Sequence, residues 1–229
     1  CGRGARQTET GLGEGPRGTT RGVPSHPDQG TGAEVGGPMV PYRGALTFHE
    51  GDMIEAAYTA ARRVGIPGDV AILNMANARH PGGGFLNGAR AQEEQLCHRT
   101  DLFLRLRLAQ SDGLYPIRPG TALITPNVAQ LRGGPPTFAA LDDPTSAVGV
   151  ISVAARQYES EAHAMRNEGG LRDELRVAWL AVLNGARELG ARALVVSALG
   201  AGAFHNPPEI VGEALVQALR SCRTGAKLE

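Results

Sequence analysis

The chain has 229 residues, 41% hydrophobic and 4% aromatic, which is enough apolar material for one α/β domain or two small ones. Its 23 Lys and Arg balance 23 Asp and Glu, so no overall charge directs it to nucleic acid or to an acidic membrane. A polyanion would have to be recognised locally. Three cysteines without a Cys-x-x-Cys pair, no apolar run near the roughly 20 residues of a membrane span, and no signal-peptide layout predict a cytoplasmic protein.

Residues 1 to 40 have the composition of a disordered tail. They contain 11 Gly and 4 Pro, no aromatic residue, and few large apolar side chains. Such a segment cannot bury enough apolar surface to offset the entropy of ordering. We therefore place a single folded domain at residues 41–229.

Residues 52 to 67 carry the pattern of an amphipathic helix. Asp52 is a suitable N-cap, and Gly65 with Pro67 ends the pattern. The apolar positions recur at i, i+3, i+4 and i+7, at Ile54, Ala57, Tyr58 and Ala61.

Four short apolar runs predict buried strands. They are Val70–Met75, Thr121–Thr125, Val148–Val153 and Ala193–Leu199. Because their apolar residues are continuous and do not alternate, we expect helices on both faces of the sheet.

Three further helices are predicted from periodic apolar positions. The first runs from Glu93 to Leu108. Its inward face carries Glu93, Cys97, Thr100, Leu104 and Leu108. The second is closed by Gly190 and has a stripe of Leu175, Trp179, Val182, Ala186 and Leu189. The last carries Val211, Ala214, Leu215, Ala218 and Leu219. The order of strands and helices predicts an α/β protein, a three-layer α/β/α domain.

The most informative segment follows the first predicted strand. Gly82, Gly83 and Gly84 precede Gln92, Glu93 and Glu94, with seven residues between the two triplets. Consecutive glycines allow a backbone to curl closely around a ligand and to direct N–H groups at negative charge. The glutamates add acid/base chemistry beside this loop.

A purely structural interpretation of the two glutamates is also open. Acids in the first turn of a helix complement its dipole. Glu94, His98, Asp101 and Arg105 fall at i, i+4, i+7 and i+11, which is a polar stripe that could simply face water.

A second glycine-containing loop follows the last predicted strand and leads into the final helix. Ligands of open α/β sheets bind beyond the carboxyl ends of strands, where free N–H groups meet phosphates. The segment from Gly200 to Phe204 is neither a Gly-x-Gly-x-x-Gly nor a Walker sequence, so it supports neither a dinucleotide nor an ATP site of those types.

These segments together resemble the bacterial-type poly(ADP-ribose) glycohydrolases of the macrodomain superfamily. The similarity extends from about Ala45 to Leu219 in consistent order. Besides the glycine and glutamate triplets, it includes Leu73–Ala78, Leu96–Cys97, Thr125–Val128, Val150–Ala155 and Gly202–Pro208.

The resemblance implies a macrodomain with a mixed central sheet that cleaves the ribose–ribose O-glycosidic bond of poly(ADP-ribose) and releases ADP-ribose. It assigns Glu94 as the catalytic acid and Glu93 as the residue that holds the ribose hydroxyls. Asn77 matches an asparagine that orients the same sugar. The predicted substrate-binding residues further include the signature residues Gly82, Gly83, Gly84 and Gln92.

The second loop matches the diphosphate-binding loop of the family, which assigns it Gly200, Ala201, Gly202, Ala203 and Phe204. Phe204 would pack beside the ribose, with a plain core phenylalanine as the alternative. No metal and no cofactor is implied, because one carboxyl group can protonate the leaving oxygen and then activate water. The implied partners are poly(ADP-ribose) and ADP-ribosylated proteins. We expect the protein to be a monomer and to bind neither nucleic acid nor a membrane.

The chain departs from the family pattern in two places. Ser197 to Gly202 replaces a Gly-Ala-Trp-Gly-Cys-Gly-like segment, and the sequence after the final helix, from Cys222 to Glu229, lacks the usual further apolar strand. A non-catalytic ADP-ribose reader, a hydrolase of terminal mono-ADP-ribose and a folded fragment without a ligand therefore stay open as alternatives. The sequence does not decide between cleavage within chains and at their ends.

Overall fold

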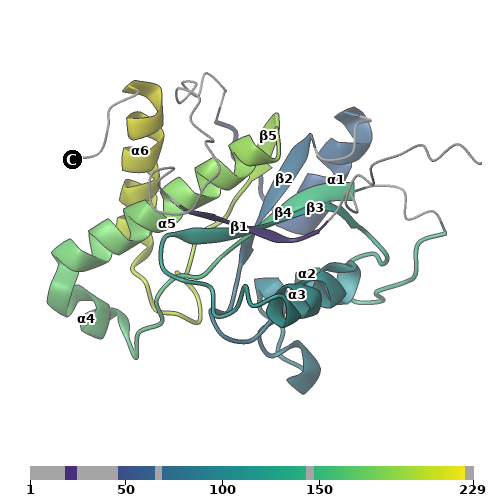
Figure 1. The fold of residues 1–229 in the computed structure, drawn as a ribbon, viewed down its shortest axis with the longest axis horizontal. Coiled ribbons are helices and arrows are strands. Elements are labelled where there is room, and N and C mark those ends of the chain that lie inside the picture. Colours follow the sequence, from purple (N-terminus) through teal and green to yellow (C-terminus); the bar gives the residue numbers. More distant parts are fainter. Residues whose placement is uncertain (1–18, 25–45, 65–68, 143–146, 225–229) are drawn as a thin grey trace, which may run out of the picture.

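A computed structural model describes residues 19–24, 46–64, 69–142 and 147–224 of the chain. Its centre is a five-stranded sheet in the order β1-β3-β4-β2-β5 (Figure 1). The strands are β1 (Arg21–Pro24), β2 (Val70–Met75), β3 (Thr121–Ala129), β4 (Ala147–Val153) and β5 (Ala193–Val195). β2 pairs in parallel with β4 and β5, whereas β3 is antiparallel to β4 and β1. The predicted mixed sheet is confirmed.

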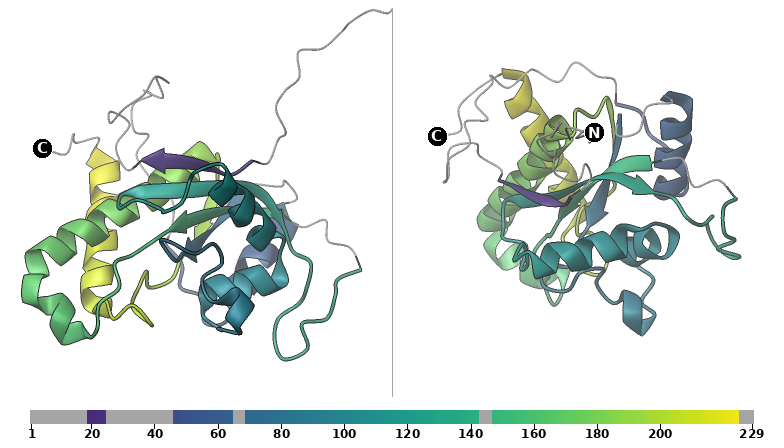
Figure 2. Two further views of the ribbon diagram at one scale, coloured as in Figure 1. Left: turned by 60° about the horizontal axis from the view of Figure 1, so that its bottom comes forward. Right: turned by 45° about the vertical axis from the view of Figure 1, so that its right-hand side comes forward.

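Helices cover both faces of this sheet, as Figures 1 and 2 show. One face packs against α5 (Glu168–Glu188) and α6 (Pro208–Thr224), and the other against α1 (Met53–Val64), α2 (Gln92–Arg99) and α3 (Leu102–Ser111). Short helical turns complete the described elements, namely η1 (Phe85–Asn87), α4 (Glu161–Ala164) and η2 (Met165–Asn167). The three-layer α/β/α architecture is therefore confirmed.

Strand β2 illustrates why the apolar runs are continuous. Ala71 and Leu73 belong to the core under α5 and α6, while Val70 and Ile72 belong to the core under α1 to α3. Successive side chains of a strand point to opposite faces. A strand with two covered faces thus needs an apolar residue at every position.

The long predicted helix is present as α5, and its stripe faces the sheet. Leu175 and Trp179 are buried, and the indole Nε1 of Trp179 donates a hydrogen bond to the carbonyl oxygen of Val211 at 3.1 Å. This bond joins α5 to α6. The predicted final helix, α6, contributes Val211, Ala214 and Ala218 to the same core.

The N-cap predicted for α1 is also confirmed. Asp52 Oδ1 accepts hydrogen bonds from the backbone N–H groups of Ile54 and Glu55 at 2.8 and 2.9 Å. On the inner face of α1, the Tyr58 hydroxyl donates to the carbonyl oxygen of Val128 at 3.0 Å. The predicted stop at Gly65 and Pro67 lies outside the described residues.

The single helix predicted from Glu93 to Leu108 is wrong, because Thr100 breaks it. Thr100 is extended, bridges to Gln130 beside β3, and uses its hydroxyl to bond Leu96 O and Leu102 N. Cys97 and Thr100 are buried as expected. Leu104 and Leu108, however, are 67% and 65% exposed, because α3 starts on a new axis and turns them outward.

Part of the predicted disordered tail is instead a strand of the sheet. Residues 21–24 form β1 on the edge of β3, and Thr20 is buried with its Oγ1 2.9 Å from Oγ1 of Thr125. Composition alone missed this strand because backbone pairing to β3 supplies the stabilisation that its small side chains lack. The rest of the predicted tail, and the start of the domain at residue 41, lie outside the described residues.

Two strand boundaries also differ from the prediction. β3 continues past Thr125 to Ala129 across an irregularity between Thr125 and Val128, and β5 ends at Val195, well before Leu199. Residues 225–229, where a further strand was predicted to be missing, are not described. None of the described helices is long and apolar enough to cross a membrane.

Candidate active site

The loop that follows β2 folds back on itself before α2. Asn77 Oδ1 accepts hydrogen bonds from the N–H groups of Arg79 and His80 at 2.9 and 3.0 Å, which starts the turn. Gly82 and Gly83 then take the left-handed conformation, with φ of 74° and 58°. This backbone brings the glycine run against the first turn of α2.

The three glycines are required by close contact as well as by backbone conformation. A Cβ at Gly82 would lie 2.7 Å from Cδ2 of Phe103, and one at Gly84 would lie 2.7 Å from Cβ of Ala89. At Gly83 a Cβ would collide with Oε1 of Glu94 and lie 3.0 Å from Oε2 of Glu93. Any side chain at residue 83 would therefore displace the carboxylates.

Glu93 is buried, and three donors hold its carboxylate. Oε1 accepts from Asn74 Nδ2 at 3.3 Å and from Gly82 N at 3.2 Å, and Oε2 accepts from Asn77 N at 2.8 Å. Glu93 thus joins strand β2, the turn after it and the glycine run. Only 3% of the surface of Glu93 is exposed.

Burial raises the pKa of Glu93 from 4.5 to about 7. The hydrogen bonds from Asn77 and Asn74 act in the opposite direction, and the neighbouring Glu94 adds to the increase. Desolvation prevails because the carboxyl group lies under the glycine run. Glu93 can consequently change its protonation near neutral pH.

Glu94 differs from Glu93 in the use of its two oxygens. Oε1 accepts a hydrogen bond from Gly84 N at 2.7 Å, whereas Oε2 is buried and has no hydrogen-bond partner among the described residues. One oxygen is thus fixed by the loop, whereas no described residue forms a hydrogen bond to the other. A polar stripe facing water is wrong for Glu94, because it is 5% exposed whereas His98, one turn later, is exposed.

The glycine N–H groups do not have the role expected from the sequence. Gly82 N and Gly84 N donate to Glu93 and Glu94, and Gly83 N donates to the carbonyl oxygen of His80 at 2.9 Å. The negative charge that this loop meets is that of the protein's own glutamates. Its N–H groups are therefore not available to a substrate in this conformation.

Gln92 fastens α2 to strand β2. Its Oε1 accepts from Met75 N, and its Nε2 donates to Leu73 O, both at 2.8 Å. Both ends of the amide are occupied by backbone, so the geometry supports a positioning role for Gln92. The predicted contact with substrate gains no support.

The second loop is built around Asn206, which is fully buried. Its Nδ2 lies 2.9 Å from Arg156 O, 3.0 Å from Gly200 O and 3.4 Å from Phe204 O. Gly200 has a φ of 76°, and a Cβ there would lie 2.6 Å from Asn206 Nδ2. Asn206 thus fixes the curvature of the loop.

This curvature leaves donors at the tip of the second loop. Within the described part of the chain, the N–H groups of Gly202, Ala203 and Phe204 have no backbone acceptor, whereas Ala201 N bonds Ala198 O. Phe204 is half-buried and packs on the core under α5 and α6. At the exposed tip of the predicted diphosphate loop, the N–H groups of these three residues are therefore free of backbone acceptors.

The two loops lie at the same edge of the sheet. They follow the neighbouring parallel strands β2 and β5, and both lie along the lower edge in Figure 1. A contact of 3.6 Å from Ser197 Oγ to Met75 Sδ links the two strand ends. The structure thus places the loop after β2, which holds the Glu93–Glu94 pair of α2, and the second loop at neighbouring strand ends.

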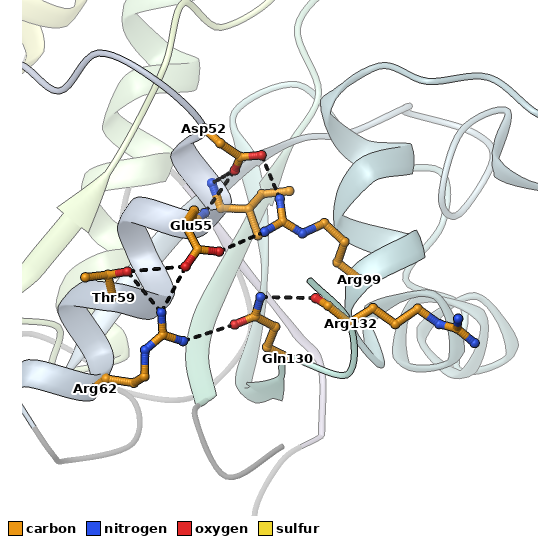
Figure 3. Close-up of polar contacts among 8 residues, drawn as sticks. Asp52, Glu55, Thr59, Arg62, Arg99, Gln130 and Arg132 are labelled. Carbon is orange, nitrogen blue, oxygen red and sulfur yellow. Dashed lines mark hydrogen bonds and ion pairs between the residues drawn. The ribbon is translucent and has the colours of Figure 1, made fainter. Parts of the chain in front are cut away.

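The opposite end of α2 is held by an ion-pair network that sequence reasoning missed (Figure 3). The guanidinium of Arg99 is fully buried and lies 2.7 Å from Asp52 Oδ2 and 3.2 Å from Glu55 Oε2. Arg62 extends the network with a 3.0 Å contact to Glu55. Arg99 therefore fastens the C-terminal end of α2 to the start of α1.

Two buried asparagines of the site were also not predicted as structural partners. Asn74 holds Glu93, and Asn206 holds the second loop. A polar residue inside the apolar run Val70–Met75 was the available signal for Asn74. In the described ranges, no group of three or more His, Cys, Asp or Glu residues is arranged to hold a metal ion.

Comparisons with known proteins show what the chain is similar to. Residues 32–119 match the family described as microbial-type PARG, catalytic domain. A poly(ADP-ribose) glycohydrolase structure from Thermomonospora curvata is 30% identical with a TM-score of 0.62, over 86% of this chain and 72% of that one. No curated protein matches the chain.

Two ligand complexes are similar as well. The Thermomonospora curvata enzyme bound to the inhibitor ADP-HPD is 33% identical with a TM-score of 0.56, over 70% of this chain. The Deinococcus radiodurans enzyme in complex with ADP-ribose is 28% identical with a TM-score of 0.60, over 74% of this chain and 70% of that one. The chain spans 62% of the length of the inhibitor-bound structure.

Proposed function

Because this chain belongs to the microbial-type poly(ADP-ribose) glycohydrolase family, we propose that it hydrolyses ribose–ribose O-glycosidic bonds of poly(ADP-ribose) and releases ADP-ribose. The observation that carries the proposal is the unequal use of the two glutamates. Glu93 is held by three protein donors, whereas Glu94 has one fixed oxygen and one buried oxygen without a partner. A carboxyl group in that condition is suited to proton exchange with a substrate.

In the proposed reaction, Glu94 is first the acid and then the base. Its carboxyl group gives a proton to the oxygen that leaves the anomeric carbon, and the C–O bond breaks through an oxocarbenium-like transition state. The resulting Glu94 carboxylate then takes a proton from the water that attacks the same carbon. Glu94 returns to its acid form, so the cycle needs neither a second carboxylate nor a metal.

Glu93 and Asn77 position the sugar in this proposal. Glu93 Oε2 accepts one hydrogen bond, from Asn77 N, and retains the capacity to accept another from a ribose hydroxyl. Because Asn77, Asn74 and Gly82 hold its carboxylate from the protein side, Glu93 presents a fixed acceptor to the sugar.

The second loop supplies the diphosphate contact. The free N–H groups of Gly202, Ala203 and Phe204 are donors of the kind that binds phosphate oxygens. Gly200 and Ala201 shape the turn, and Phe204 has its half-exposed ring at the end of the loop. We expect this loop to hold the diphosphate while the loop after β2 holds the ribose.

We further propose a monomer that acts on ADP-ribosylated proteins in the cytoplasm, without nucleic acid or a membrane. Cys97 and Cys222 are both buried and free, as expected of a protein in a reducing compartment.

The test is the Glu94→Gln variant. We expect it to bind ADP-ribose as tightly as the wild type in calorimetry and to lose release of ADP-ribose from poly(ADP-ribose), because the amide cannot donate the proton. Glu161→Gln, an exposed acid on α4, is the matched control and should keep both properties.

The outcomes separate the alternatives. Unchanged cleavage by Glu94→Gln would refute its role as the acid. A wild type that binds ADP-ribose but releases none from either substrate is a non-catalytic reader, and release from mono-modified protein alone identifies a mono-ADP-ribose hydrolase. A protein that does not bind ADP-ribose is a folded fragment without this ligand.

A further inference from the structure

A group of aromatic rings gathers beside the Glu93–Glu94 pair. Three of the five phenylalanines surround His98, from three separate elements. The centroid of the Phe85 ring is 4.7 Å from those of His98 and Phe103, and the Phe138 ring is 5.8 Å from His98. We call these four residues the aromatic cluster.

The aromatic cluster is continuous with the catalytic loop. Phe103 packs under Gly82, where an added Cβ would come within 2.7 Å of its ring. Phe85 directly follows Gly84, the residue whose N–H holds Glu94, and His98 lies one helical turn after Glu94 on α2. The rings thus extend outward from the carboxylates.

The cluster is also accessible. His98 is exposed, and the three phenylalanines are half-buried. A chain with only 4% aromatic residues has therefore placed four ring side chains, three of them large and apolar, partly in solvent at one place next to its reactive group. Ring faces in such a position can stack on a planar base.

The segments that carry the three phenylalanines are free of acids, whereas α2, which carries His98, also contains the two buried glutamates Glu93 and Glu94. Residues 77–91, α3 and residues 130–141 contain no Asp or Glu but include five arginines, Arg79, Arg90, Arg105, Arg107 and Arg132. Arg105 pairs with Asp101, whereas the other four make no ion pair with any described residue. In a protein with a net charge of zero, this is a local positive region. Arg132 extends away from the Asp52–Glu55 carboxylates in Figure 3.

We propose that the aromatic cluster and these arginines bind the ADP-ribose unit on the leaving-group side of the scissile bond, with its adenine on the rings and its diphosphate on the arginines. The inference rests on the proposed function. In a ribose–ribose bond, the leaving oxygen belongs to the ribose that carries the next adenine. That base must therefore lie close to the group that protonates the oxygen, which is where the cluster begins.

Charge favours this occupant over a protein partner. The exposed Leu104 and Leu108 of α3 offer some apolar surface, but they alternate with Arg105 and Arg107. Each further ADP-ribose unit brings two negative phosphates and one base. A surface that combines ring faces with arginines, on segments that contain no Asp or Glu, matches that chemistry.

The test compares binding of poly(ADP-ribose) oligomers and of free ADP-ribose by the Glu94→Gln protein, which does not consume them. Adding Phe138→Ala should weaken oligomer binding about tenfold and leave ADP-ribose binding unchanged. Phe48→Ala is the matched control, because Phe48 is 95% exposed near α1 and outside the cluster. His98→Ala removes an exposed ring and serves as a second variant if Phe138→Ala unfolds.

Charge reversal tests the second half of the proposal. Arg132→Glu should weaken oligomer binding and reduce its dependence on salt, since fewer counterions are released. Arg166→Glu is the control, because Arg166 is exposed, makes no ion pair with a described residue and lies in η2, after α4, away from the cluster.

The result that overturns the inference is equal binding of oligomer and monomer by the Glu94→Gln protein, or an equal loss for both ligands in Phe138→Ala, His98→Ala and Arg132→Glu. Failure of the proposed function looks different, because the wild type then releases no ADP-ribose while oligomer binding is still measurable.

Discussion

Glu93 should make the stability of this protein depend on pH in an unusual direction. Its pKa is raised from 4.5 to about 7 by burial. Below pH 4.5 the carboxyl group is protonated in both the folded and the unfolded chain. Between pH 4.5 and 7 the unfolded chain releases the proton while the folded chain retains it, so the folded state loses stability as the pH rises. The full loss is about 3 kcal/mol.

The Glu93→Gln variant isolates this contribution because an amide does not titrate. Its amide nitrogen would face donors from Asn74, Asn77 or Gly82, which lowers stability by an amount that does not vary with pH. The readout is therefore the change with pH in the difference between wild type and variant. We expect the free energy of unfolding of the wild type to fall by about 2 to 3 kcal/mol relative to the variant between pH 5 and pH 8.

Urea unfolding at pH 5, 6, 7 and 8 measures this difference directly. Glu50→Gln is the control, because Glu50 is exposed and forms no ion pair with a described residue. A difference between wild type and Glu93→Gln that is the same at pH 5 and pH 8 would refute the reasoning. It would mean that the three donors, and not burial, determine the protonation of Glu93.

Two further substitutions test the supports of the site. Gly83→Ala should abolish cleavage, because the added Cβ collides with Glu94. Gly88→Ala is the control: its backbone is also left-handed, with φ 77°, but no atom lies within 4 Å of the added Cβ, so it should lower only the stability, by about 1 kcal/mol. Equal activity of the two variants in an ADP-ribose release assay would contradict this. Arg99→Ala should lower the free energy of unfolding by about 3 kcal/mol, because it empties a fully buried site. The exposed Arg62→Ala should cost less than about 1 kcal/mol, and a similar cost for both arginines in urea unfolding would count against the role of burial.

The sequence predicts the core of this fold because most of its elements are stabilised by their own apolar pattern. The stripe of α5 and the apolar run of β2 each identify a buried surface without outside information. Residues 21–24 behave differently. Their order comes from backbone pairing with β3, which no side-chain pattern in the strand itself records.

The same distinction explains the site. The glycine and glutamate triplets are recognisable because their spacing is local, and their proximity after folding follows from the strand that precedes them. The break at Thr100 depends on Gln130, a residue 30 positions away. The full burial of Arg99 likewise depends on Asp52 and Glu55 from another helix. Such distant partners are visible only in three dimensions.

The first turn of α2 is bonded to strand β2 and to the loop that follows it. Gln92 is bonded to the main chain of β2, Glu93 to the turn after β2, and Glu94 to the N–H of Gly84. Every bond between α2 and this strand and loop that involves these three residues goes to backbone atoms, except that from Asn74.

The seven residues between Gly84 and Gln92 are exposed or half-exposed, and their side chains form none of these bonds. Substitutions of the exposed Leu86, Asn87 and Arg90 can therefore alter the surface of this loop without moving the reactive carboxylates. The exposed side chains of this loop are therefore open to evolutionary change or to engineering, while the backbone bonds that hold the carboxylates stay in place.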